Sequence, residues 1–384
     1  MARSLGRAGI NVIGVSSAED PPAAYSRLFS FRTGPPLQET AAALRFYVEL
    51  GEELHGDTVL FPTGDQSVHF ISAHRAELDP PLYRYLLPLP HDVDRITSKR
   101  HFAALADELQ LPMPRTVLPD DSAELQEAAS SLRFPCVLKP EFTHLWRTQK
   151  ARSAGLGQTK AVPAADKEEL RSRYEELAQV DRALVVQEMV LGPDENHVDY
   201  HALVDGAGAL RGEFAGKKLR LTPPHFGVGS YVESVDPSEV SQTGRLVLER
   251  LGFRGMANMN FKRDDRDGRL YLLELNPRFS NWTGLDIACG IDFADLYYMA
   301  CVGAPYDAPS RYGLGKRWLN FAADRESMKI YAREGTCSWP RWAWSIARSS
   351  SWSLYAPTDP GPAWVHLRRT ARRRIGGLLP LAVL

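Results

Sequence analysis

The pattern of apolar and polar positions over residues 271–278 predicts a strand that carries its polar side chains on one face. Alternation along a strand places Glu274, Asn276 and Arg278 on the same side. Residues 255–262 form a second strand-like segment, and residues 264–268 between the two have the composition of a hairpin turn. In that hairpin, Asn260 and Glu274 are expected to face each other across the ladder.

The chemistry of these side chains indicates a metal and phosphate site. A carboxylate and carboxamide oxygens are ligands that suit Mg²⁺ when the phosphates of a nucleotide supply the remaining coordination. An adjacent guanidinium suits a phosphoryl group in transfer. An ordinary hairpin with a polar outer face has the same local pattern, so the rest of the chain has to decide between the two interpretations.

The first part of the chain has the pattern of a βαβ unit. Apolar strands are expected at residues 11–15 and 58–61, with a helix at 39–54 and a turn at 56–57 between them. The loop after the second strand then lies at the carboxyl edge of a parallel sheet, where open sheets bind ligands. Asp65 in that loop is either a substrate contact or the N-cap of the next helix. The chain opens on a helix at residues 2–9, so the first strand of the unit is expected to be missing.

Further along, strands and helices continue to alternate. Helices are expected at 99–109, after Ser98 as a cap, and at 167–177; strands are expected at 136–140, 183–188 and 197–205. A loop with some glycine, residues 152–157, separates the first two of these strands. The expected fold class is therefore mixed, α/β in the N-terminal part and α+β after it. We expect four segments, 1–93, 94–187, 188–310 and a Trp- and Arg-rich extension, 311–384.

Composition narrows the class of protein. The 384 residues are 44% hydrophobic and 10% aromatic, which indicates a folded chain of more than one unit. The formal net charge of -1 offers no overall attraction to nucleic acid or to an anionic membrane. The four cysteines are not spaced as a disulfide framework or a zinc site, which fits a reducing cytoplasm.

The C-terminal tail is the one segment whose sequence suits contact with a membrane. Arginines at 368, 369, 372, 373 and 374 precede an apolar stretch over 375–384, an arrangement that suits the surface of a membrane. A docked or frayed terminal helix is the favoured interpretation. The oligomeric state is left open, with a homodimer as one candidate.

Several single residues suggest chemistry, each with a plainer alternative. Lys139 ends an apolar strand and needs an anionic partner, unless its ammonium group reaches solvent at the sheet edge. Lys217, Lys218 and Arg220 form a basic cluster that suits an acid substrate or a solvated strand edge. His197 and His201 share a strand face, but without an evident third ligand they do not indicate a metal pair. No Gly-x-Gly-x-x-Gly follows a strand, which argues against a dinucleotide-binding oxidoreductase.

Taken together, the chain resembles the ATP-grasp superfamily, in the carboxylate–amine ligase branch that includes D-aspartate ligases. The resemblance runs from the helix at residue 2 to the segment 359–362, and Glu274-x-Asn276-x-Arg278 at its distance from the preceding strand is the specific element. The other matching elements are Lys99 with His101 and Phe102, residues 134–140, Val186-Gln187-Glu188, residues 255–262 and Asp267-Gly268.

The resemblance implies a role for each matching position. Two lobes hold ATP between antiparallel sheets. Lys99 and Lys139 bind the phosphates; Glu188, the Met189 carbonyl and the Leu191 amide read adenine; Glu195 or His197 meets the ribose. Asn260, Glu274 and Asn276 coordinate Mg²⁺, while Arg278 steadies the phosphoryl group or the substrate carboxylate, and Lys218 and Arg220 bind the acid. The implied reaction transfers the γ-phosphoryl group to a carboxylate, and an amine then attacks the acyl phosphate, with release of ADP and phosphate.

Three features depart from the family pattern. Asn260 stands where the family usually has Asp, Glu or Gln, the phosphate-covering loop is poor in glycine and has Trp146, Arg147 and Arg152 nearby, and the first strand is missing. Two other functions therefore stay open. One is a nucleotide-binding regulatory protein without turnover, and the other is an enzyme that phosphorylates bicarbonate, as carboxylases and carbamoyl-phosphate synthases do. The chain shows no biotin-attachment or glutaminase region, which argues against a self-contained enzyme of the second kind.

Overall fold

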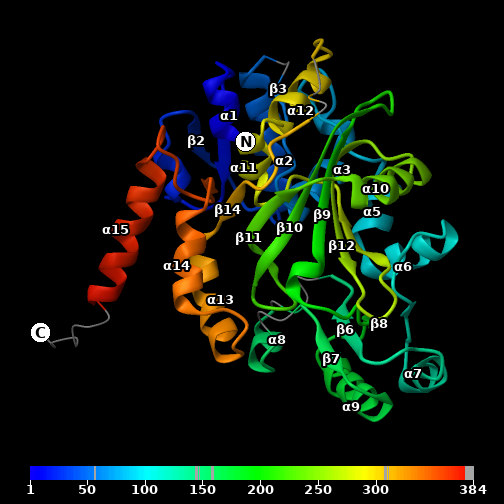
Figure 1. The fold of residues 1–384 in the computed structure, drawn as a ribbon. Helices are drawn as coiled ribbons and strands as arrows, with labels where there is room; N and C mark the ends of the chain where they lie inside the picture. The colour runs from blue at the N-terminus through cyan, green and yellow to red at the C-terminus, as the bar shows by residue number, and fades with distance from the viewer. Residues whose placement is uncertain are drawn as a thin grey trace, which may run out of the picture.

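The computed structural model describes residues 1–376 except 56–57, 143–145, 147, 157–159, 307–308 and 310. Two sheets dominate it (Figure 1). The large sheet has seven strands in the order β13-β12-β9-β10-β11-β14-β15, and the small sheet has four in the order β5-β8-β6-β7. Their strands are β5 (Thr116–Val117), β6 (Cys136–Pro140), β7 (Val162–Ala164), β8 (Leu184–Glu188), β9 (His197–Val204), β10 (Leu210–Thr222), β11 (Val228–Val235), β12 (Gly255–Arg263), β13 (Leu270–Asn276), β14 (Arg317–Leu319) and β15 (Ser351–Trp352).

Helices lie around both sheets, and α7 and α9 lie beside the small sheet at the bottom of Figure 1. Ser98 caps α6 as expected, because its hydroxyl accepts a hydrogen bond from the amide of His101 at 3.2 Å. The α-helices are α1 (Ala2–Arg7), α2 (Thr40–Glu53), α3 (Asp65–Ala73), α4 (Arg75–Leu78), α5 (Pro90–Thr97), α6 (Lys99–Glu108), α7 (Ser122–Ala129), α8 (Gln149–Ser153), α9 (Lys167–Ala178), α10 (Ser238–Arg250), α11 (Thr283–Cys289), α12 (Phe293–Val302), α13 (Phe321–Arg333), α14 (Trp339–Ala347) and α15 (Gly361–Gly376).

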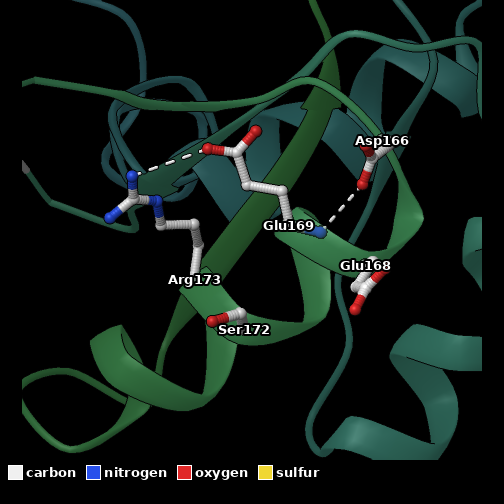
Figure 2. A pocket seen from close by; sticks show the side chains of 5 residues that line it. All are labelled: Asp166, Glu168, Glu169, Ser172 and Arg173. Carbon is white, nitrogen blue, oxygen red and sulfur yellow. Dashed lines mark hydrogen bonds and ion pairs between the residues drawn. The ribbon is translucent and has the colours of Figure 1, made fainter.

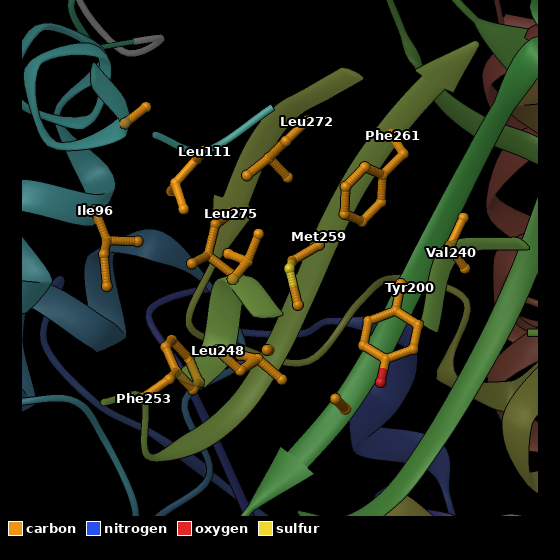
Figure 3. Close-up of a cluster of buried hydrophobic side chains, with 14 of the residues drawn as sticks. Ile96, Leu111, Tyr200, Val240, Leu248, Phe253, Met259, Phe261, Leu272 and Leu275 are labelled. Carbon is orange, nitrogen blue, oxygen red and sulfur yellow. The ribbon is translucent and has the colours of Figure 1, made fainter. Parts of the chain in front are cut away.

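Alternation along β9 explains how the large sheet is packed. Val198, Tyr200 and Ala202 point to one face, where they form a hydrophobic cluster with side chains of α10, β12 and α6 (Figure 3). Leu203 points to the other face, into a second cluster that includes Trp282 and side chains of α11 and α12. The sheet is thus buried on both faces, and the polar residues at the start of β9 are left on the second face, beyond the reach of that cluster.

The predicted hairpin is confirmed. β12 and β13 pair antiparallel, with Asn260 opposite Glu274 and Asn258 opposite Asn276. Gly268 in the connecting turn has a φ of 67°, a left-handed conformation that glycine adopts without strain. β12 also pairs antiparallel with β9, which sets Asn260 beside Asp199. One row across three strands therefore reads Asp199, Asn260, Glu274.

The N-terminal part contains parallel strand pairs, but the two strands predicted to flank the helix of one βαβ unit lie in separate two-stranded sheets. β1 (Ile13–Ser16) pairs with β2 (Ser30–Thr33), and β3 (Thr58–Val59) pairs with β4 (Tyr83–Arg84), both parallel. The sequence analysis identified β1 and β3 but missed their partners, because β2 and β4 are short and lack a clear apolar alternation. The turn expected at 56–57 lies outside the described residues. The loss of a first strand and the four-segment division stay predictions.

The C-terminal extension supplies strands β14 and β15 of the large sheet and the helices α13, α14 and α15, which lie together on one side of the molecule (Figure 1). Trp364 on α15 is 73% exposed, whereas Ala363 beside it is buried. In the part of the chain that is described, no helix has the length and apolar character needed to cross a bilayer. The apolar end of the tail, residues 377–384, lies outside the described residues, so the prediction about membrane contact stays open.

Candidate active site

Four cations surround the carboxylate of Glu274. Burial by itself raises the pKa of Glu274, but the nearby charges of Lys160, Lys99, Arg278 and Lys139 outweigh it and hold the pKa below its ordinary value. The side chains come from four separate segments, namely the loop before β7, the start of α6, the end of β13 and strand β6. We call these five residues the cationic cluster. Its excess of positive charge favours binding of a polyanion.

The two lysines that the resemblance assigns to phosphate both lie in this cluster. The Lys139 ammonium group donates to Gln187 Oε1 on β8 at 2.7 Å, and the Lys99 ammonium group donates to the Glu141 carbonyl at 3.3 Å. Burial lowers the pKa of Lys139 to about 8, and the charge of Lys99 adds to that effect. Burial also lowers the pKa of Lys99, against the opposing effect of Glu274. Two lysines that disfavour each other's charge are stabilised when an anion lies between them.

Arg278 links the cluster to the N-terminal part of the chain. It forms an ion pair with Asp65 in the first turn of α3 and also contacts Asn276, whose Oδ1 lies 3.4 Å from its Nη2. Asp65 is not the N-cap of α3, because Gly64 occupies that position and the Ser67 hydroxyl accepts from the Gly64 amide. This ion pair joins the N-terminal part of the chain to the end of β13. Asp65 therefore lies where it was expected, beside the candidate site.

Lys218 lies on the same face, next to the row of Asp199, Asn260 and Glu274. Its ammonium group is 2.8 Å from Asp199 Oδ1 and donates to Asn260 Oδ1 at 3.0 Å. Both members of the ion pair are buried, with side chains 4% and 3% exposed. Asn260 in turn donates from Nδ2 to Asn258 Oδ1 at 3.3 Å. The side-chain carboxamide of Asn260 is thus hydrogen-bonded through both its oxygen and its nitrogen.

The segment predicted to read adenine is bonded to other parts of the protein. Glu188 is buried and accepts hydrogen bonds from the amide and the guanidinium of Arg133, each at 2.9 Å. The Met189 carbonyl accepts from Arg266 at 2.7 Å, and the amide of Leu191 donates to the carboxylate of Asp264. Arg266 and Asp264 belong to the β12–β13 turn. An adenine base that donates a hydrogen bond to the Met189 carbonyl has to displace the guanidinium of Arg266 from it.

The two ribose candidates differ in burial. Glu195 is exposed on the short 3-10 helix Asp194–Asn196. His197 is buried, and its Nδ1 lies 2.9 Å from the Asp194 carbonyl oxygen. Burial lowers the pKa of His197 well below its ordinary value, and the charges of Lys218 and Lys262 add to this. The lowered pKa favours the neutral form of His197.

Arg220 is not brought to the cluster. Its guanidinium forms a buried ion pair with Asp324 on α13 and donates to the Ser345 hydroxyl at 2.8 Å. A shift in register between Lys218 and Arg220 separates the two side chains along β10. Asp324 also accepts from the Ser230 hydroxyl and from the Trp342 indole. This environment holds α13 and α14 against the sheet, and binding of the acid by Arg220 stays a prediction.

The oxygen atoms beside the cluster fit a hard cation. Glu274 supplies one carboxylate and Asn276 a carboxamide, the donor types that Mg²⁺ accepts together with phosphate oxygens. Among the described residues, no group of three His, Cys, Asp or Glu side chains could hold a metal by itself. A metal at this position therefore needs an anionic ligand to complete its coordination. The phosphates of a nucleotide have that character.

A hollow elsewhere on the surface carries none of this chemistry. Asp166, Glu168, Glu169, Ser172 and Arg173 line it at the start of α9 (Figure 2). Asp166 caps that helix, since its carboxylate accepts from the Glu169 amide at 2.9 Å. Arg173 forms an ion pair with Glu169 one turn away. These side chains stabilise the helix, and none belongs to the predicted site.

Two residues of the site were missed by the sequence analysis. Asp199 alternates with His197 and His201 on β9, so the strand pattern that placed the histidines on one face also includes it. Lys160 follows a stretch with no clear pattern, and Gly157 and Arg147 of the expected phosphate-covering loop lie outside the described residues. Only the folded chain brings Lys160 near Glu274.

Comparison with known proteins bears on the fold and on the family resemblance. No protein-family model matches the chain. The sequence is 26% identical over 361 residues to the D-aspartate ligase of Enterococcus faecium, covering 86% of this chain and 83% of that protein. N5-carboxyaminoimidazole synthetase from Staphylococcus aureus has a TM-score of 0.62 at 13% identity and covers 87% of this chain and 81% of its own. L-amino acid ligase from Bacillus licheniformis has a TM-score of 0.57 at 18% identity, covering 80% and 71%.

The likeness covers most of the length of each chain in all three comparisons, although identity is low throughout. The resemblance to the carboxylate–amine ligase branch is confirmed, and the chain has the ATP-grasp fold.

Proposed function

We propose that this protein is an ATP-dependent ligase that activates a carboxylate as an acyl phosphate and joins it to an amine. The cationic cluster carries the proposal. Four cations lie near the carboxylate of Glu274, and one of them, Arg278, also pairs with Asp65. The remaining excess of positive charge in a partly buried site favours a ligand with several negative charges, such as a triphosphate. The likeness to a D-aspartate ligase over most of both chains supports an amino acid as the acid substrate.

In such a reaction, each residue of the site has a role that follows from its position. Lys99, Lys139 and Lys160 bind and orient the phosphates. Glu274 and Asn276 hold Mg²⁺, which supplies charge neutralisation for the phosphoryl group in transfer. Arg278 lies at the same end of β13 as the metal ligands and is placed to bind the γ-phosphoryl group or the substrate carboxylate. The reaction needs positioning and electrostatic stabilisation more than a protein nucleophile, and these side chains provide both.

The base and ribose contacts complete the proposal. Glu188, the Met189 carbonyl and the Leu191 amide receive the adenine after Arg266 gives way, and His197 or Glu195 meets the ribose. His197 is suited to accept or donate a hydrogen bond to a hydroxyl group because it is neutral. Lys218 faces the acid substrate from the far side of Asn260.

Release of ADP in the presence of paired substrates tests the proposed function. Purified protein with ATP and Mg²⁺ is screened against amino acids and amines, each alone and in pairs. The proposal expects ADP release that requires both an acid and an amine. Release that bicarbonate supports without an amine would assign the protein to the bicarbonate-using class instead, and ATP binding without any release would assign it to the regulatory class.

The lowered pKa of Lys139 predicts opposite effects of pH on binding and on stability. In the folded protein Lys139 loses its proton near pH 8, whereas in the unfolded chain it keeps the proton up to its ordinary value of 10.5. The free energy of unfolding therefore gains a stabilising contribution as pH rises from about 8 to 10.5. The affinity for ATP falls as pH rises above 8, because the charge that attracts the phosphates is lost. The shift of Lys99 acts in the same direction.

Calorimetric titration with ATP at pH values from about 7 to 9 measures this dependence. Lys139→Met is expected to bind ATP more weakly at neutral pH and to lose less affinity on going to high pH. An affinity of the wild type that is constant over this range would contradict the assignment of Lys139 to the phosphates.

A further inference from the structure

Asn260 occupies a metal-ligand position of the family pattern, yet its oxygen atom already has a partner. The Lys218 ammonium group donates to Asn260 Oδ1 at 3.0 Å and lies 2.8 Å from Asp199 Oδ1. The side chain of Lys218 is 4% exposed, and that of Asp199 is 3% exposed. The ammonium group is thus fixed between two oxygen atoms, on the row that continues to Glu274.

The charges on this row are unequal. Asp199 is neutralised by Lys218, while Glu274 is left as the carboxylate that faces the cations Lys99, Lys139 and Lys160. A first divalent cation would be held by Glu274 and Asn276, and the phosphates of the nucleotide would supply the remaining negative charge. A second one beside Asn260 would meet a neutral amide oxygen and a fixed ammonium group at close range, which is unfavourable by simple electrostatics.

We infer that Lys218 takes the place of a second metal ion, so that the site binds one divalent cation per nucleotide through Glu274 and Asn276 and not through Asn260. This inference rests on the proposed function and corrects the role that the resemblance gave to Asn260. Lys218 is a positioning residue, since it holds Asp199 and Asn260 beside Glu274. Lys218 is part of the chain, whereas a second metal ion would bind and leave with the nucleotide.

The buried ion pair also explains why the position tolerates asparagine. A carboxylate at residue 260 would compete with Asp199 for the single ammonium group and would leave one of the two negative charges without a partner in a buried site. The amide provides an acceptor for Lys218 through Oδ1 and a donor for Asn258 through Nδ2. Asn260 therefore fits a network with one cation and one anion.

The stoichiometry of bound Mn²⁺ tests this inference without any measurement of turnover. Electron paramagnetic resonance reports the free Mn²⁺, and ADP is kept below the protein concentration so that all of it is bound. We expect one Mn²⁺ per bound ADP in the wild type. The double variant Lys218→Met/Asn260→Asp releases Asp199 and adds a carboxylate, and we expect it to bind two.

The matched control is Lys217→Met, on the same strand as Lys218. Lys217 pairs in register with Val198, so its side chain lies on the opposite face of the sheet. This variant is expected to keep one Mn²⁺. Two Mn²⁺ per ADP in the wild type would overturn the inference, whether or not the double variant folds. Failure of the wild type to bind ADP at all would overturn the proposed function and the inference with it, and the same titration distinguishes the two results.

Discussion

Glu274→Gln is expected to lower metal-dependent ATP turnover by a factor on the order of 10³. The substitution keeps the shape of the side chain and removes its negative charge. Three lysines and an arginine then lie around a neutral amide, and Asn276 is left without a charged partner for Mg²⁺. Because the charge at Glu274 both binds the metal and balances the cations, the substitution should weaken Mg²⁺ binding and slow transfer of the phosphoryl group.

The rate of ADP release measures this effect, and thermal unfolding shows whether the variant is folded. Glu233→Gln is a matched control, because Glu233 is a partly buried carboxylate on β11 of the same sheet that pairs with Arg317. It is expected to keep its turnover. Turnover by Glu274→Gln within about threefold of the wild type would contradict the assignment of the metal to this residue, since a lost charge of this kind costs at least about 10².

Arg220→Met is expected to lower the free energy of unfolding by about 3–5 kcal/mol, because it leaves the carboxylate of Asp324 buried without its cation. Asp324 is fully buried, and its other partners are the Ser230 hydroxyl and the Trp342 indole, which carry no charge. The loss should weaken the attachment of α13 and α14 to β10 and β11. Urea denaturation measures it.

Arg32→Met provides the comparison for this prediction. Arg32 forms an ion pair with Glu53 in which the two side chains are 40% and 56% exposed, and its loss should leave the free energy of unfolding nearly unchanged because solvent screens the pair. If Arg220→Met unfolds like the wild type but needs more acid substrate for half-maximal rate, Arg220 binds the substrate as the sequence analysis predicted, and the structural role is wrong.

Local sequence patterns were sufficient to predict the strands with alternating apolar and polar residues and the helix with a capping residue. The β12–β13 hairpin and the pairing of Asn260 with Glu274 followed from alternation and a turn rich in Asp and Gly. Helix α6 began where Ser98 predicted it. These features depend on residues close together in the chain, so the sequence alone determines them to a good approximation.

Contacts between distant residues could not be predicted in the same way. Arg220 and Asp324 are 104 residues apart, and nothing in the sequence near Arg220 indicates that its partner lies on α13. Lys218 donates a hydrogen bond to Asn260, 42 residues further on, so a residue assigned to the metal is bonded to a residue assigned to the acid. The pairing of Lys218 with Asn260 depends on the order of strands in the large sheet, which brings β9, β10 and β12 together. The pairing of Arg220 with Asp324 depends on the packing of α13 against β10.

Calorimetric titration of the purified protein with ATP, in the presence and absence of Mg²⁺, tests the central claim most directly. The claim is that the cationic cluster around Glu274 is a site for Mg²⁺ and ATP. We predict one ATP bound per chain with an affinity that depends on Mg²⁺, and loss of that dependence in Glu274→Gln. Absence of ATP binding by folded protein, or equal binding with and without Mg²⁺, would contradict the claim.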